Sequence, residues 1–199
     1  ADVSSFDEIL ETCAASGCMV SLSSLKITEI NEKRVALLKK CGVKTVTVAV
    51  ESANSETRKK ILKNISDEQI FNAMKILKKY HLKAKIYLIA GFSGTDPVKE
   101  AEDVVLFLEK LDACSLLYDV TLSIAPLSPK PLTPFQDSVF IDKKEYKKYM
   151  VTLKKGISHF QKKVKVDFFS YKESEFDYMT GVLKGKEFVK FIIENIKTE

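Results

Sequence analysis

The sequence predicts an α/β fold in which parallel strands alternate with helices, forming part of a (β/α) barrel or a small open sheet. Apolar, β-branched runs alternate along the chain with segments whose apolar residues repeat at helical spacing. Two of these runs, residues 44–50 and 85–90, end in small, polar or acidic residues before the next helix. This order indicates right-handed parallel βαβ units, and the expected strands are too few to close an eight-stranded barrel.

The elements near the start of the chain follow from apolar spacing and stop signals. An apolar stripe over residues 6–13 predicts a helix, and residues 18–22 predict a short strand. Thr28 is the expected N-cap of the next helix, and Gly42 is its expected stop. The strand at 44–50 follows directly.

The next two helices carry clear start signals. Ser66 and Gln69 have the spacing of a capping box, and apolar residues at helical spacing come after them. Beyond the strand at 85–90, Asp96 is the expected N-cap and Pro97 takes the first helical position. A further strand is expected at residues 120–125, which closes the repeating region.

A proline-rich segment, residues 126–136, separates this region from the rest of the chain. It contains four of the five prolines, namely Pro126, Pro129, Pro131 and Pro134. Such a segment is neither a helix nor a central strand. It either lines a substrate pocket or acts as a stiff connector. We therefore predict two parts, a partial barrel over residues 1–136 and a C-terminal extension over residues 137–199.

The extension is expected to hold a long basic helix from about residue 143, a strand at 164–169 and a final helix. The basic helix carries eight outward lysines, which are Lys143, Lys144, Lys147, Lys148, Lys154, Lys155, Lys162 and Lys163. These lysines either contact RNA or form a solvated face. The net charge is only +5 and few aromatic residues interleave with the lysines, which favours the solvated face.

Composition and cysteine usage limit the class of protein. The chain has 199 residues, of which 45% are apolar and 30% charged, as in ordinary core-forming proteins. No apolar run approaches the roughly 20 residues that span a bilayer, and no basic-then-apolar leader is present. The irregular spacing of Cys13, Cys18, Cys41 and Cys114 predicts buried, reduced thiols in the cytoplasm and no metal site. The chain begins at Ala1 without an initiator Met, from which we expect a longer parent polypeptide.

The ends of two expected strands form the candidate site. Glu51 follows the strand at 44–50, whereas Gly91 and Gly94 follow the strand at 85–90. Because ligands bind at the carboxyl ends of parallel strands, these residues predict a site for a polar ligand approached by backbone. The residues alone leave a second interpretation open, in which Glu51 is a surface acid beside a helix start and the glycines are turn residues.

Four motifs together resemble the radical S-adenosylmethionine (radical SAM) enzymes. They are the serine-bearing turn at 23–26, Glu51-Ser52 with the segment 58–69, the glycine motif at 86–94, and the proline segment. The proline segment is similar to a branch that usually carries a cobalamin-binding domain upstream. The resemblance covers most of residues 18–136 and, more faintly, residues 170–196. It implies a partial TIM-type barrel.

The resemblance also implies roles for particular residues. Glu51 would accept hydrogen bonds from the ribose hydroxyls or the amino group of S-adenosylmethionine, and Lys63 would meet its carboxylate. Gly91 and Gly94 would let the backbone approach the adenine. Lesser polar contacts are expected from two serines, Ser24 and Ser52. On the residues alone, Lys63 is equally well a solvated lysine.

The chain departs from the family pattern in its cysteines. Radical SAM enzymes hold a four-iron, four-sulfur (4Fe-4S) cluster on three closely spaced cysteines, and the sequence has no such triplet. The resemblance therefore implies an iron–sulfur oxidoreductase parent whose missing N-terminal part carries the cluster, with cobalamin on a further upstream domain. This chain alone is expected to be inactive, and no catalytic residue is assigned.

Two other classes of function stay open on the sequence. One is a non-catalytic scaffold that binds RNA through a helix at 143–165, and the other is an unrelated βα-barrel enzyme that holds a phosphate at Gly91 and Gly94. His81 and His159 support no enzymatic role. If the upstream units are absent, the strand at 18–22 has an unpaired edge, which predicts self-association through it.

Overall fold

The computed structural model describes residues 5–133 and 135–196, so Pro134 of the proline segment lies outside the described residues. Within that part, a parallel sheet has the strand order β1-β2-β3-β4. The strands are β1 (Thr45–Glu51), β2 (Lys83–Ala90), β3 (Val120–Pro126) and β4 (Val164–Phe168). The predicted α/β class with parallel strands is confirmed, and the arrangement agrees with a partial TIM-type barrel.

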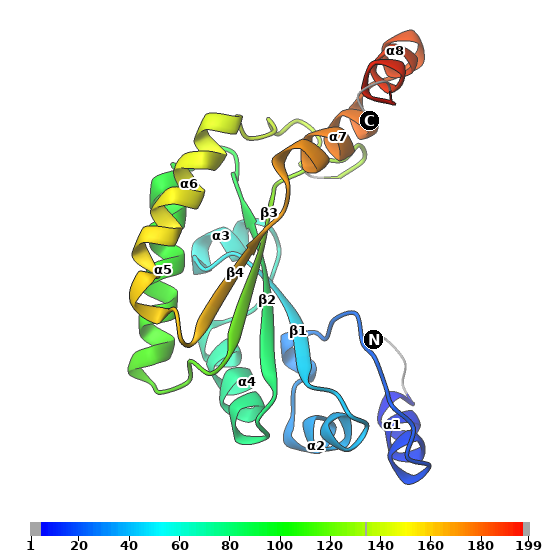
Figure 1. Cartoon of the computed structure of the whole chain (residues 1–199), viewed down its shortest axis with the longest axis vertical. Helices are drawn as coiled ribbons and strands as arrows, with labels where there is room; N and C mark the ends of the chain where they lie inside the picture. The colour runs from blue at the N-terminus through cyan, green and yellow to red at the C-terminus, as the bar shows by residue number, and fades with distance from the viewer. Residues whose placement is uncertain (1–4, 134, 197–199) are drawn as a thin grey trace.

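Helices connect successive strands, as right-handed βαβ units require. The α-helices are α1 (Phe6–Ala15), α2 (Glu32–Lys40), α3 (Ser55–Lys60), α4 (Asp67–Lys79), α5 (Pro97–Ala113), α6 (Lys143–Gly156), α7 (Tyr171–Val182) and α8 (Gly185–Ile196), with short 3-10 turns at Ile27–Glu29 and Ser158–Phe160. Figure 1 shows α5 and α6 packed side by side on one side of the sheet. No helix in the described residues is long and apolar enough to cross a membrane.

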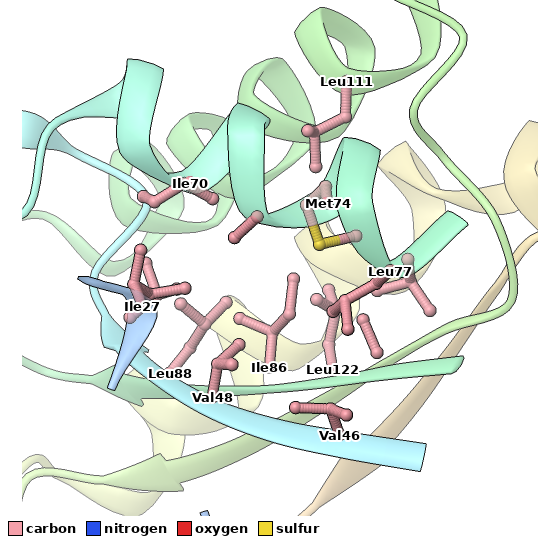
Figure 2. Packing of buried hydrophobic residues seen from close by; sticks show 14 of the residues in the cluster. Ile27, Val46, Val48, Ile70, Met74, Leu77, Ile86, Leu88, Leu111 and Leu122 are labelled. Atoms are coloured by element: carbon pink, nitrogen blue, oxygen red, sulfur yellow. The ribbon is translucent and has the colours of Figure 1, made fainter. Parts of the chain in front are cut away.

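The core lies between the sheet and these helices. Val48, Ile86 and Leu122 from three strands point toward Ile70 and Met74 of α4 (Figure 2). All five side chains are at most 2% exposed. Because side chains alternate along a strand, the intervening residues belong to the other face of the sheet.

That other face is mostly polar and keeps contact with solvent. One row across the sheet consists of Thr47, Lys85, Thr121 and Lys165, which are register partners on β1 to β4. These four side chains are half-buried or exposed, in contrast to their core-facing neighbours. We call this row the polar row.

Several start and stop signals are confirmed. Ser66 and Gln69 form a capping box on α4, Asp96 caps α5 with Pro97 in its first turn, and Gly42 after α2 has φ +78°. The N-cap of α2 is not Thr28, as expected, but Asn31, whose side chain accepts from the Arg34 amide at 2.9 Å. A short 3-10 turn occupies the position of Thr28 and delays the helix.

The predicted strand at 18–22 is wrong. After Gly17, at φ +68°, the segment runs outside the sheet, and Met19 is 90% exposed. Its amide at Val20 donates to the Cys41 carbonyl, and the chain first meets β1 at Leu25, whose amide donates to the Thr47 carbonyl at 2.9 Å. The predicted self-association assumed a strand edge at residues 18–22, and no strand forms there.

The C-terminal part differs in extent from the expectation. The basic helix ends at Gly156 rather than near 165, because the chain turns into β4 at Val164. β4 pairs with β3, so one sheet contains strands from both sides of residue 136. The division of the chain at that residue stays a prediction. Helix α7 was not expected from the sequence, since its apolar residues have weak periodicity and none is fully buried.

The thiols are less buried than expected. Cys41 is buried, which raises the pKa of its thiol, whereas Cys13 is half-buried and both Cys18 and Cys114 are exposed. All four are free. In the described residues no group of three His, Cys, Asp or Glu side chains could hold a metal ion.

Candidate functional site

The end of β1 carries the first part of the candidate site. Glu51 is the last residue of β1 and has φ +69°, a left-handed conformation that is unfavourable for a side chain with a Cβ. The register with β2 shifts between Ala49 and Glu51, which re-aims the Glu51 side chain. Its carboxylate Oε1 accepts from Lys63 Nζ at 3.2 Å.

Both members of this pair remain accessible. The Glu51 side chain is 25% exposed and that of Lys63 is 33% exposed. A partly exposed pair contributes little to stability, because water solvates both charges well. An incoming zwitterion can therefore replace each partner, with its ammonium on Glu51 and its carboxylate on Lys63.

A groove adjoins the pair. Its volume is about 410 Å³, and its lining includes Ser24, Ala49 and residues 62–65. The complete lining is Ser24, Leu25, Lys26, Ile27, Thr28, Ala49, Leu62, Lys63, Asn64 and Ile65. The structure thus brings the predicted residues Ser24 and Lys63 together in one groove, with Glu51 in contact through Lys63.

Ser52 lies elsewhere. Its residue is 7% exposed, and its Oγ accepts from the Asn54 amide at 3.2 Å. Asn54 in turn caps α3 and donates to Asp103 at 2.9 Å. In this structure Ser52 therefore organises the turn that follows Glu51.

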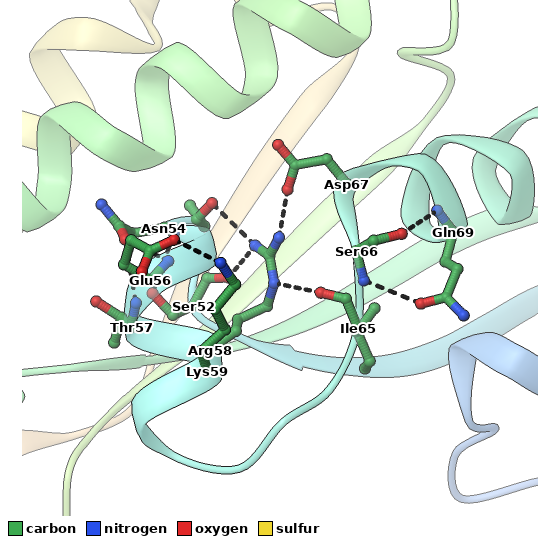
Figure 3. Close-up of polar contacts among 11 residues, drawn as sticks. Ser52, Asn54, Glu56, Thr57, Arg58, Lys59, Ile65, Ser66, Asp67 and Gln69 are labelled. Carbon is green, nitrogen blue, oxygen red and sulfur yellow. Dashed lines mark hydrogen bonds and ion pairs between the residues drawn. The ribbon is translucent and has the colours of Figure 1, made fainter.

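A buried arginine supports the same turn (Figure 3). Arg58 is 0% exposed, and its guanidinium donates to the carbonyls of Ser52, Ala53 and Ile65 at 2.9, 3.0 and 3.0 Å. It also forms an ion pair with Asp67, the first residue of α4. The sequence analysis missed this network, because nothing in the run Arg58–Lys60 tells the buried cation from the two exposed ones.

The turn after β2 carries the two predicted glycines. Gly91 has φ +86° and Gly94 has φ +78°, so both occupy the left-handed region that favours glycine. A Cβ at Gly91 would lie 2.7 Å from Ile141 Cβ, whereas a Cβ at Gly94 would meet no atom within 4 Å. Gly91 is thus required by packing as well as by conformation, and Gly94 faces open space.

An internal carboxylate closes this turn. Glu100 of α5 accepts from the amides of Gly91 and Phe92 at 2.7 and 3.0 Å and from Thr95 Oγ1 at 2.8 Å. Burial raises the pKa of Glu100, and the three hydrogen bonds lower it in part. The sequence analysis did not single out Glu100, although its place in the first turn of the helix after a glycine turn is a usable signal.

The glycine turn opens into a different cavity from the groove beside Lys63. This second cavity has a volume of about 320 Å³, and its lining includes residues 91–95 and 139–142. The six predicted site residues therefore divide into three groups: Glu51 and Lys63 with Ser24, Ser52 within a turn, and Gly91 with Gly94.

Comparison with known proteins gives one family match. Residues 3–108 match the radical SAM superfamily. An uncharacterized protein of Methanocaldococcus jannaschii is 27% identical over 164 residues, which are 82% of this chain and 34% of that protein. An uncharacterized methyltransferase of Pyrococcus horikoshii is 33% identical over 90 residues, 45% of this chain and 19% of that protein. The chain thus spans about a third or less of these relatives.

A solved structure shares the fold. Coproporphyrinogen III oxidase (HemN) from Escherichia coli, described as a radical SAM enzyme, superposes with a TM-score of 0.53 at 14% identity. The superposition covers 68% of this chain and 31% of that one. At this identity the likeness concerns the arrangement of strands and helices.

Proposed function

This chain belongs to the radical SAM superfamily, and from that premise we propose that it supplies one side of an S-adenosylmethionine site. It would form the carboxyl-terminal part of the catalytic domain of a longer iron–sulfur enzyme. The share of the relatives that it covers, at most 34%, supports this proposal.

The Glu51–Lys63 pair carries the proposal. S-adenosylmethionine has an amino group and a carboxylate on one carbon, so it can exchange with both members of an accessible carboxylate–ammonium pair. Ser24 in the adjoining groove is a donor or acceptor for the same ligand. When bound, S-adenosylmethionine supplies the reactive sulfonium centre, and these residues bind and orient it.

The remaining predicted residues have less direct roles. Gly94 leaves open space beside the turn, so the backbone there can approach an adenine, as proposed for both glycines. Gly91 contributes mainly the shape of the turn, because its amide already donates to Glu100. Ser52 would contribute by shaping the turn behind Glu51 rather than by direct contact.

The 4Fe-4S cluster does not fit the described residues of this chain, where no three ligands converge. We propose that its cysteines lie in another part of the parent protein and that this chain alone is inactive. The use of cobalamin by the parent rests only on the resemblance of the proline segment. Methyl transfer is a candidate reaction for the same ligand, supported by the methyltransferase among the relatives.

The two alternative functions receive less support. A phosphate would compete with Glu100 for the amides of Gly91 and Phe92, and the two anions would repel each other. On the basic helix, Lys148 is paired with Glu145 and Lys154 lies over the Phe168 ring. Fewer lysines are thus available for RNA than the sequence suggests.

Calorimetric titration of S-adenosylmethionine into the full-length parent protein tests the proposal, because this chain is proposed to supply only one side of the site. We expect binding that Glu51→Ala weakens by about 1–3 kcal/mol, or roughly 5- to 150-fold, because polar ligand groups lose their partner. Glu56→Ala is the matched control, since Glu56 is an exposed acid of the same segment that pairs with Lys59. Equal binding by the two variants of the parent protein would contradict the site.

Reconstitution tests the proposed division of labour. Under anaerobic conditions with iron and sulfide, this chain should form no stable cluster and should not cleave S-adenosylmethionine. Stoichiometric cluster absorbance would overturn the proposal that the ligands lie in another part of the parent.

A further inference from the structure

Arg58 is a fully buried cation in a chain whose other lysines and arginines keep some exposure wherever the structure describes them. Burial of a charge is costly unless hydrogen bonds and an opposite charge compensate it. Arg58 has both, since its guanidinium binds three carbonyls and the Asp67 carboxylate. All three of its guanidinium nitrogens are thereby engaged.

The partners of Arg58 lie in the two segments that carry the candidate ligand charges. The carbonyls of Ser52 and Ala53 belong to the two residues after Glu51, and the carbonyl of Ile65 lies two residues after Lys63. The main chain makes a further link, since the Lys63 amide donates to the Arg58 carbonyl at 2.8 Å. Arg58 therefore links the segment after Glu51 to the segment around Lys63.

Both segments contain backbone that needs such support. Glu51 has φ +69° and Leu62, directly before Lys63, has φ +58°. For residues with a Cβ this conformation persists only where surrounding contacts hold it. After Glu51, the Arg58 guanidinium binds the next two carbonyls, those of Ser52 and Ala53. After Leu62, the Arg58 carbonyl accepts from the next amide, that of Lys63, and the guanidinium binds the Ile65 carbonyl three residues on.

We propose that Arg58, held by Asp67, is the positioning residue that sets the Glu51 carboxylate opposite the Lys63 ammonium. The role of the pair toward S-adenosylmethionine rests on the proposed function, whereas the geometry of the pair does not. Arg58 itself meets no ligand in this arrangement. Its planar fork binds several carbonyls at once, which the single ammonium of a lysine cannot reproduce.

The chain offers a matched control in Arg34. Its guanidinium donates to Asp7 at 2.6 Å and to the carbonyl and carboxylate of Glu29, outside the two segments that carry Glu51 and Lys63. Arg34→Lys therefore removes a comparable fork from the same fold. If Arg58 is purely structural, both Arg58→Lys and Arg34→Lys should lower the thermal unfolding temperature, and neither should change the Glu51–Lys63 contact.

The first experiment compares Arg58→Lys with Arg34→Lys by competitive acylation and mass spectrometry, at a temperature where circular dichroism shows both variants folded. In the unaltered chain Lys63 should react slowly, because its side chain is only 33% exposed and its ammonium contacts Glu51. In Arg58→Lys its rate should rise toward that of exposed Lys60, and in Arg34→Lys it should not change. An unchanged Lys63 rate in folded Arg58→Lys overturns the proposal.

Asp67→Asn covers the case in which Arg58→Lys does not fold. This variant keeps the three carbonyl bonds and removes only the charge that holds the guanidinium, so Lys63 should become more reactive to a smaller extent. No increase in folded Asp67→Asn would then decide against the proposal. The acylation result needs no ligand and stands whether or not S-adenosylmethionine binds.

Titration of the full-length parent protein with S-adenosylmethionine separates this inference from the proposed function. We expect the Kd to rise about tenfold in Arg58→Lys and to stay unchanged in Arg34→Lys, since displaced charges bind their partners less well. If Glu51→Ala binds S-adenosylmethionine as tightly as the unaltered parent protein, the proposed function fails, and the Lys63 acylation rates alone decide the role of Arg58.

Discussion

The ends of β1 and β2 are neighbours in one sheet, but they differ in whether their polar groups are available to a ligand. At the end of β1, Glu51 and Lys63 are partly exposed, and among the described residues each is paired with the other, at 3.2 Å. At the end of β2, the amides of Gly91 and Phe92 are already satisfied by Glu100 from the same chain. One end leaves charges available to a ligand, and the other is closed by an internal carboxylate.

The supporting residues differ in the same way. Behind the β1 end a buried arginine holds two loops that carry the charges. At the β2 end the carboxylate of Glu100 replaces any external anion. Two strand ends with similar sequence signals can therefore differ in role. One leaves charges accessible to a ligand, and the other uses its polar groups to hold its own loop.

The largest effect expected from this contrast concerns Gly91. Gly91→Ala should lower the free energy of unfolding by about 3 kcal/mol, because the alanine adopts a left-handed conformation and its Cβ meets Ile141. Gly94→Ala has only the conformational cost, about 1 kcal/mol. Urea denaturation of both variants measures the difference. Equal losses would show that packing against Ile141 does not set the β2 turn.

A smaller effect is expected from the ionisation of Glu100. Because burial raises its pKa in the folded state, the folded chain holds this proton more tightly than the unfolded chain. The stability due to protonated Glu100 is complete below the ordinary pKa of 4.5 and is lost as pH rises through the raised folded value. The unfolding free energy should therefore contain a component that decreases with pH in this window.

Glu100→Gln is the control for that component. Denaturation curves collected from about pH 4 to about pH 8 should have a more negative slope in the unaltered chain than in the variant. Identical slopes would mean that the carboxylate at the β2 end is not under the burial that the structure describes.

The smallest effect tests the open end. Glu51→Gly should raise the free energy of unfolding by about 0.5 kcal/mol, because glycine adopts φ +69° without cost and offsets its greater freedom in the unfolded chain. The same variant should bind S-adenosylmethionine as poorly as Glu51→Ala. A loss of stability instead would identify Glu51 as a structural acid and remove the contrast between the two ends.

The sequence predicted the helical elements best where local chemistry decides. The capping box at Ser66 and the Asp96-Pro97 start are confirmed, because each satisfies helix amides with side chains close in sequence. The strand at 18–22 was wrong because strand formation depends on a neighbour. Val20 and Leu22 pack against the core, but the backbone first pairs with the sheet at Leu25.

The sequence predicted the exposed polar residues of the candidate site but not the buried residues that hold their loops. Strand-end logic singled out Glu51 and Gly91, and the structure brings Lys63 to Glu51. Arg58 was missed because the sequence does not distinguish a buried arginine from the exposed lysines beside it. Glu100 was missed although its place in the first turn of a helix after a glycine turn was a usable signal. Single-sequence patterns identify exposed polar groups at strand ends more readily than the buried charges that hold them.

The polar row across the sheet limits the kind of surface that can cover that face. Parallel sheets are ordinarily enclosed on both sides by apolar layers, yet this face offers two hydroxyls and two ammonium groups in line. An apolar segment packed on this face would remove water from those groups without forming hydrogen bonds with them, which costs free energy for each group. A segment that packs stably on this face must therefore offer hydrogen-bond acceptors to the polar row or leave water bound to it. The face with the polar row thus stays hydrated, whereas the face toward α4 excludes water.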